Sequence, residues 1–107
     1  MLNLTVHVKV KDNSNIEKFE YHLGEMAKKC PLEPGCIYYK VNKITEKVGS
    51  ERKKINGEFL IIETWESEEA WKKHLELETY LTHYKTSLID LLERDVYFLE
   101  DINEQKA

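Results

Sequence analysis

One segment late in the chain gathers side chains that can exchange protons. Tyr80, His83 and Tyr84 lie close together, and the apolar residues around them recur at helical spacing, so the three share one helical stretch. A hydroxyl and an imidazole placed there can reach a pocket between a helix and a sheet, where they would bind a substrate. The alternative is that they line a core, and the sequence leaves both interpretations open.

Glu63 and Trp65 are two further candidates, and their alternate spacing places them on the same face of a strand. Trp65 either forms an aromatic wall that stacks on a planar substrate or belongs to the core. An unpaired buried carboxylate is costly, so Glu63 either orients a basic or histidine partner or faces water at a dimer interface. The adjacent Tyr38 and Tyr39 point to opposite faces of another strand, and Tyr38 is taken as a substrate-binding candidate.

The sequence predicts no metal site. His22, His74 and His83 provide no pair four residues apart on a helix, and no Asp or Glu completes a ligand set with them. Cys30 and Cys36 match no zinc spacing and are expected to be reduced thiols with a structural or incidental role. The chain also lacks a Gly-rich phosphate loop and a nucleophile elbow.

Four segments have the composition and alternation of β-strands. Residues 2–10 alternate apolar and polar side chains and give the clearest pattern. Residues 36–46 and 59–65 are rich in β-branched and aromatic side chains, and residues 95–101 alternate again. The second and third of these strands carry sizeable side chains on both faces, so both faces need cover.

Helical spacing of apolar residues marks the segments between the strands. Residues 14–30 predict a first helix, which Pro31 ends because proline cannot continue the hydrogen-bond ladder. A second helical region begins after a Ser67 N-cap and breaks near residues 77–79. A further stretch over residues 79–93 repeats the helical pattern. Residues 47–57 are polar and predict a hairpin loop.

The order β-α-β-β-α-β predicts a ferredoxin-like α+β sandwich, with a four-stranded antiparallel sheet and the helices on one face. Residues 1–102 are expected to form a single domain, followed by a frayed C-terminal tail over residues 103–107. The other sheet face would remain uncovered in a monomer. A second copy of the same sheet is the economical cover, so the pattern predicts a homodimer.

Composition narrows the classes of partner. The 107 residues carry 16 basic and 20 acidic side chains for a net charge of −4, and the basic residues are spread along the chain. This distribution argues against a nucleic-acid partner. No apolar run approaches the length of a membrane span, and the N-terminal residues lack the order of a signal peptide. We therefore expect a cytoplasmic protein without membrane or nucleic-acid partners.

Two segments resemble the antibiotic biosynthesis monooxygenase (ABM) family of small dimeric α+β barrel proteins. One is E-P-G-C-I-Y-Y-K-V at residues 33–41, and the other is F-L-I-I-E-T-W-E-S-E-E-A-W-K-K-H-L at residues 59–75. The second segment matches the family pattern at Glu63, Trp65, Ser67, Ala70 and His74. The resemblance implies the dimeric α+β barrel fold.

The resemblance also implies an activity and a role for His74. It suggests a cofactor-independent monooxygenase, similar to small quinol monooxygenases, that acts on a small aromatic or quinone-like substrate with dioxygen as co-substrate. His74 would be the catalytic base, since a neutral imidazole can take a proton from a bound phenol or quinol and leave an electron-rich anion. A structural hydrogen bond is the alternative role for His74.

Two positions depart from the family pattern. Many members carry a second histidine where this chain has Thr79, and some oxygenase members carry an asparagine where it has Ile61. Both departures favour an alternative function, a non-catalytic small-ligand-binding or stress-associated dimer of the same fold.

Overall fold

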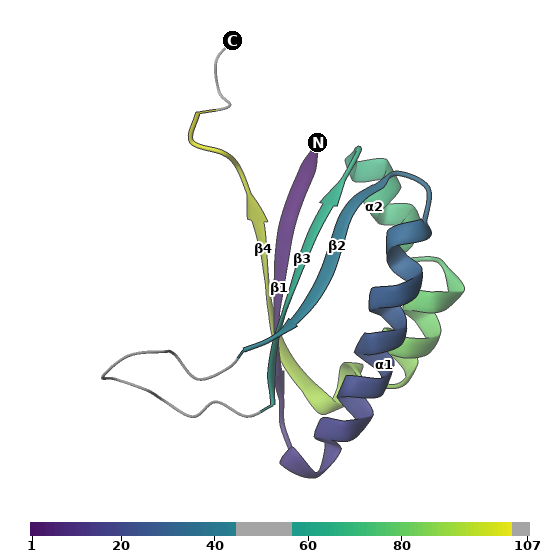
Figure 1. Ribbon diagram of the computed structural model, residues 1–107, viewed down its shortest axis with the longest axis vertical. Helices are drawn as coiled ribbons and strands as arrows, with labels where there is room; N and C mark the ends of the chain where they lie inside the picture. Colours follow the sequence, from purple (N-terminus) through teal and green to yellow (C-terminus); the bar gives the residue numbers. More distant parts are fainter. Residues whose placement is uncertain (45–56, 104–107) are drawn as a thin grey trace.

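Four antiparallel strands form one sheet, and the helices cover one of its faces (Figure 1). The structure is a computed structural model that describes residues 1–44 and 57–103. The strand order is β2-β3-β1-β4, which confirms the predicted ferredoxin-like α+β fold. The strands are β1 (Leu2–Val10), β2 (Cys36–Lys43), β3 (Glu58–Trp65) and β4 (Leu92–Leu99). The predicted hairpin loop lies outside the described residues except for Gly57, as does the predicted tail except for Asn103.

The first helix, α1 (Ile16–Lys29), lies within the predicted range. A 3₁₀ turn, η1 (Asn13–Asn15), precedes it, and the Asp12 carboxylate accepts a hydrogen bond from the Ser14 backbone N–H at 2.9 Å. A second 3₁₀ turn, η2 (Cys30–Leu32), follows and contains the proline predicted to end the helix. In the described part of the chain, no helix is both long enough and apolar enough to cross a membrane.

The second helix, α2 (Glu68–His74), begins at the predicted cap, where the Ser67 hydroxyl accepts a hydrogen bond from the Ala70 backbone N–H at 3.1 Å. The predicted break follows. A π-helix, η3 (Tyr80–Thr86), and a 3₁₀ turn, η4 (Ile89–Leu91), then lead into β4. The prediction of a helix to residue 93 is wrong at its end, because Leu92 instead opens β4 opposite Val10.

The sheet separates a buried face from an open one. Along β3 the residues alternate between half-buried and buried, and the buried row faces the helices. The same row continues on β1, so the core lies between the sheet and α1 with η3. The largest buried side chains of this core are Leu4, Phe19, Leu23, Met26, Ile61, Trp65 and Leu88. Glu63 belongs to the buried row by position and is therefore held in an apolar layer.

A bulge near the start of β2 changes which side chains face the helices. Cys36 pairs with Trp65 and Tyr38 pairs with Thr64, so Ile37 is an extra residue with no partner on β3. Strict alternation would place Ile37 on the same face as Tyr39. Instead Ile37 is 51% exposed, while Tyr39 is buried, because a bulge inserts an extra residue and shifts the alternation before it.

Candidate functional site

A cavity of about 290 Å³ lies between the buried sheet face and the helical layer. Every strand contributes to it, together with α1, α2 and η3. Its walls are largely apolar or aromatic, formed by Leu4, Val6, Met26, Ile61, Trp71, Leu75, Val96 and Phe98. Its polar groups are the side chains of Tyr39, Glu63, His74, Tyr80, Tyr84 and Arg94. Few polar groups in a mostly apolar cavity are typical of a small-molecule site.

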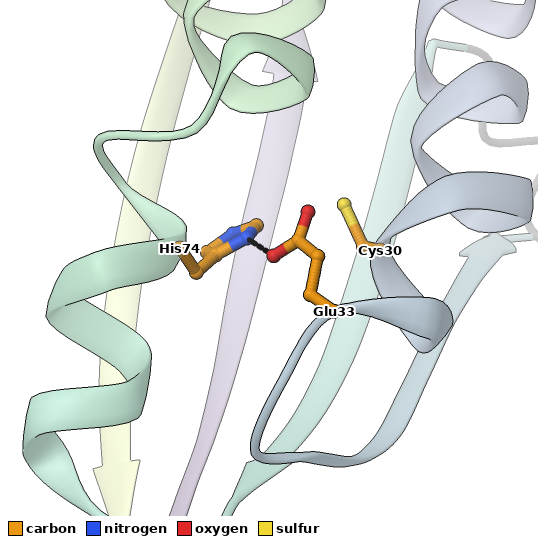
Figure 2. A group of neighbouring side chains, drawn as sticks. All are labelled: Cys30, Glu33 and His74. Carbon is orange, nitrogen blue, oxygen red and sulfur yellow. Dashed lines mark hydrogen bonds and ion pairs between the residues drawn. The ribbon is translucent and has the colours of Figure 1, made fainter.

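His74 and Glu33 form a buried pair at one side of the cavity (Figure 2). The His74 Nδ1 atom lies 2.7 Å from the Glu33 Oε1 atom, and the two side chains are 2% and 9% exposed. His74 ends α2, whereas Glu33 lies in the turn between η2 and β2. The chain thus brings together two residues 41 positions apart.

Gly35 explains how α2 comes close enough for this pair to form. Its backbone has a φ of +82°, which favours glycine, and a Cβ atom there would lie 2.5 Å from the Ala70 Cβ atom. The Gly35 carbonyl also accepts a hydrogen bond from the Glu66 backbone N–H at 2.8 Å. This close packing fixes the N-terminal turn of α2 against the start of β2.

The environment of His74 keeps its imidazole neutral. Burial lowers the pKa of His74, and the hydrogen bond and charge of Glu33 only partly oppose that effect. A neutral imidazole beside a carboxylate carries its proton on Nδ1 and donates it to Glu33. Nε2 then has a free lone pair, and the described residues offer it no hydrogen bond. Since His74 lines the cavity, this geometry provides a base for a bound molecule.

Glu63 is the second buried carboxyl group of the site. It is 4% exposed, and its Oε1 atom accepts a hydrogen bond from Trp65 Nε1 at 2.9 Å. Burial raises the pKa of Glu63 to about 7; the Trp65 hydrogen bond opposes this rise and the charge of Glu33 adds to it. Glu63 therefore exchanges protons near neutral pH.

Aromatic rings surround His74 on several sides. The Trp65 ring centroid lies 4.7 Å from that of His74, and the centroids of Tyr80 and Tyr39 lie at 5.4 and 5.8 Å. Tyr80 also stacks on Tyr84 at 5.3 Å. These rings fix the orientation of the imidazole and give the cavity flat walls.

Arg94 brings a positive charge to the cavity. Its Nη1 atom lies 3.4 Å from the Tyr84 hydroxyl oxygen, and its guanidinium carbon lies 5.6 Å from the centre of the Tyr84 ring. Burial raises the pKa of Tyr84, although Arg94 opposes the rise. Arg94 itself is exposed, so its charge lies where the cavity meets solvent and can attract an anionic group.

The structure places four of the seven predicted site residues around the cavity, namely Glu63, His74, Tyr80 and Tyr84. Trp65 does not line the cavity, but it contacts both Glu63 and His74 from the core. Tyr38 and His83 lie elsewhere. Tyr38 belongs to the row on the open face and is 45% exposed. The His83 Nδ1 atom lies 2.9 Å from the His22 Nδ1 atom, where η3 packs on α1.

Among the polar and aromatic residues of the site, the predicted set lacks Glu33, Tyr39, Trp71, Arg94 and Phe98. Glu33 stood inside the quoted E-P-G-C segment, and this was the one available signal for it. The choice of Tyr39 over Tyr38 depends on the register of β2 against β3, which pairs Tyr39 with Glu63. Arg94 lies outside the predicted strand of residues 95–101, because β4 begins three residues earlier. Arg94 and Phe98 pair with Val8 and Leu4, so they stand on the helix-facing side of the sheet and line the cavity.

Comparisons with known proteins agree with this architecture. The sequence model of the family described as antibiotic biosynthesis monooxygenase matches residues 1–86. A crystal structure described as an antibiotic biosynthesis monooxygenase is similar with a TM-score of 0.75 and 19% identity, over 95% of this chain and 99% of that one. No protein among those of curated function matches the chain.

Two other solved structures have the same fold. A conserved protein of unknown function from Bacteroides thetaiotaomicron, described as a possible oxidoreductase, gives a TM-score of 0.70 at 25% identity, over 92% of this chain and 95% of that one. A protein from Pseudomonas aeruginosa gives a TM-score of 0.71 at 19% identity, over 92% and 91% of the two chains.

Proposed function

Because the chain belongs to the antibiotic biosynthesis monooxygenase family, we propose that it oxygenates a small aromatic substrate of the phenol or quinol class with dioxygen and without a bound cofactor. The observation that carries the proposal is the buried Glu33–His74 pair at the edge of an aromatic cavity. The carboxylate holds the Nδ1 proton and so leaves Nε2 as the base.

The cavity suits a flat molecule with a small number of rings. Its volume of about 290 Å³ lies at the lower end of the range for ligand pockets. The rings of Trp71 and Phe98 meet edge to face at 5.3 Å on one side, and Tyr80 stands on another. Aromatic walls of this kind suit the faces and edges of planar aromatic ligands.

The proposed reaction starts with a proton transfer. His74 Nε2 takes the hydroxyl proton of a bound phenol, and the charge of Arg94 favours the anion that forms. The anion passes one electron to dioxygen. The two radicals then combine at a ring carbon that carries hydrogen, and the protonated His74 returns its proton to the peroxide. Loss of water leaves a quinone, so one oxygen atom enters the product and the other leaves as water.

Oxygen uptake with a panel of quinols and phenols, including menadiol and 1-naphthol, tests this proposal. Replacing His74 by alanine is expected to lower turnover by about 10², the usual contribution of a positioned base. Isotopically labelled dioxygen should place one labelled atom in the quinone formed from 1-naphthol. The matched control is His22→Ala, because His22 lies outside the cavity.

Two results would contradict the proposal. Unchanged turnover in His74→Ala would remove His74 from the mechanism. Binding of the aromatic probes without any oxygen uptake would instead favour the alternative, a ligand-binding dimer without catalysis.

The two departures from the family pattern do not interrupt the Glu33–His74 pair. Ile61 is an apolar part of the cavity wall, and Thr79 lies in a separate depression beside His83.

We further propose that the protein works as a homodimer in the cytoplasm. The open sheet face exposes Tyr38, Tyr97 and Leu99 by 45%, 54% and 49%, and exposed apolar patches of this kind favour association. A second copy of the same face satisfies the two-fold symmetry of most dimers. Cys30 and Cys36 are free thiols, a state that a reducing compartment maintains.

A further inference from the structure

Three side chains with different metal-binding chemistry meet beside the cavity. The thiol of Cys30, the carboxylate of Glu33 and the imidazole of His74 each offer one ligand atom, and these atoms all lie within 4.8 Å of one another. Figure 2 shows the three side chains pointing toward one another from η2, the turn after it, and the end of α2. Spacing along the chain does not reveal this set, because its members come from separate segments.

The second carboxylate oxygen of Glu33 lies beside the Cys30 thiol and meets no stronger donor among the described residues. Glu33 Oε2 is buried on a side chain that is 9% exposed, and it has no hydrogen bond of ordinary geometry with a described residue. The group beside it is the thiol of Cys30, which is only a weak donor. In Figure 2 this oxygen points toward the sulfur of Cys30. A buried polar atom without a partner is costly and calls for an explanation.

The charge of Glu33 is also poorly balanced. Within residues 1–44 and 57–103 its one ion-pair partner is His74, and that contact uses Oε1, so Oε2 meets no cationic side chain. A cation between Glu33 and Cys30 would supply both the missing partner and the missing charge.

We propose that Cys30 Sγ, Glu33 Oε2 and His74 Nδ1 form a site for a divalent zinc ion. A thiol, an imidazole and a carboxylate together match the ligands of zinc, whereas magnesium and calcium prefer oxygen ligands alone. Zinc holds such ligands at about 2.0 to 2.3 Å, so side-chain movements of about 1 Å complete the set. On binding, the thiol proton of Cys30 passes to solvent, and the fourth position of a tetrahedral ion stays open.

Zinc at this site would change what His74 can do. A neutral imidazole has one N–H and one lone pair, so coordination through Nδ1 moves the remaining proton to Nε2. His74 then no longer offers a lone pair to the cavity. Zinc therefore inhibits the proposed oxygenation; this consequence rests on the proposed function, whereas zinc binding itself does not.

Cobalt(II) replaces zinc in the experiment, because a cobalt–thiolate bond gives a charge-transfer absorption in the near ultraviolet. The full-length protein, purified under reducing conditions and treated with a chelator, is titrated with cobalt and then with zinc as competitor. We expect one ion per chain, the charge-transfer band, and loss of the band as zinc displaces cobalt. Cys36→Ser is the matched control and should bind as the natural chain does, since Cys36 lies outside the ligand group.

Two variants test the ligands while keeping side-chain volume. Cys30→Ser is expected to lose the charge-transfer band. Glu33→Gln is expected to bind cobalt at least about ten-fold more weakly, because losing even a residue that only contacts a metal ligand lowers metal affinity by about that factor. Far-ultraviolet circular dichroism confirms that each variant is folded. Absence of cobalt and zinc binding in the natural chain, or a band that survives in folded Cys30→Ser, would overturn the proposal. Binding is read without any turnover, so failure of the oxygenase proposal leaves this result interpretable.

Discussion

Replacing Glu63 by glutamine should change how folding stability depends on pH. Glu63 is buried on the helix-facing side of β3, where burial raises its pKa from the ordinary 4.5 to about 7. Between these two values the folded protein holds a proton that the unfolded chain releases, so stability falls as pH rises from about 4.5 to 7. Above about 7 both states are ionised, and the loss is complete.

The size of this effect follows from the same two pKa values. At about 1.4 kcal/mol per pKa unit, the rise from 4.5 to about 7 costs about 3 kcal/mol of stability at alkaline pH. Glutamine cannot ionise, and its amide oxygen can still accept the hydrogen bond that Trp65 Nε1 donates to Glu63. The stability of Glu63→Gln relative to the natural chain should therefore grow by about 3 kcal/mol across this pH range.

Urea unfolding followed by tryptophan fluorescence measures this difference, at a series of pH values from about 4.5 to 8.5 and at one fixed protein concentration. Glu66→Gln is the matched control, because Glu66 follows the same strand but is exposed. Its stability relative to the natural chain should stay constant. If the Glu63→Gln difference is equally flat, the carboxyl group is not held in a desolvated state, and the account of its environment is wrong.

Two other predictions concern packing and assembly. Gly35→Ala should lower stability by about 2 to 4 kcal/mol in the same unfolding assay, from the positive φ and the contact with Ala70. Gly24→Ala in α1 is its control and should be neutral or stabilising, since a Cβ there meets nothing within 4 Å; equal stability of the two variants would refute the packing argument. Tyr97→Asp on the open face should convert the proposed dimer into monomers in analytical ultracentrifugation, whereas Tyr21→Asp on α1 should not. A natural chain that sediments as a monomer at micromolar concentration would rule the dimer out.

The fold was predictable because its signals are local. Alternation in β1, the β-branched and aromatic composition of β3, the Ser67 cap and the prolines after α1 are signals that each act over a few residues. Together they set the order of elements. The start of β4 was missed for the same reason. Leucines at helical spacing also suit the beginning of a strand, and only pairing of Leu92 with Val10 decides between the two.

The site was predictable only in part. Alternation along β3 correctly joins Glu63 to Trp65. It does not show that Tyr39 rather than Tyr38 faces the cavity, because that depends on the register in which β2 pairs with β3. Nor does it join Glu33 to His74, since their contact follows from how closely α2 approaches the start of β2. Contacts between distant segments carry no periodic signal in the sequence.

The Glu33–His74 contact also has a consequence for how the protein matures. Its two residues are 41 positions apart, and pairing of Cys36 with Trp65 closes most of that loop. Docking of α2 on the start of β2 is the step that then brings His74 to Glu33. A partly folded chain with a formed sheet but an undocked α2 would hold neither the base nor the ligand set. The Nδ1 proton of His74, shielded from water by burial, should therefore be a reporter of the last step of folding, visible by nuclear magnetic resonance only once the helical layer is complete.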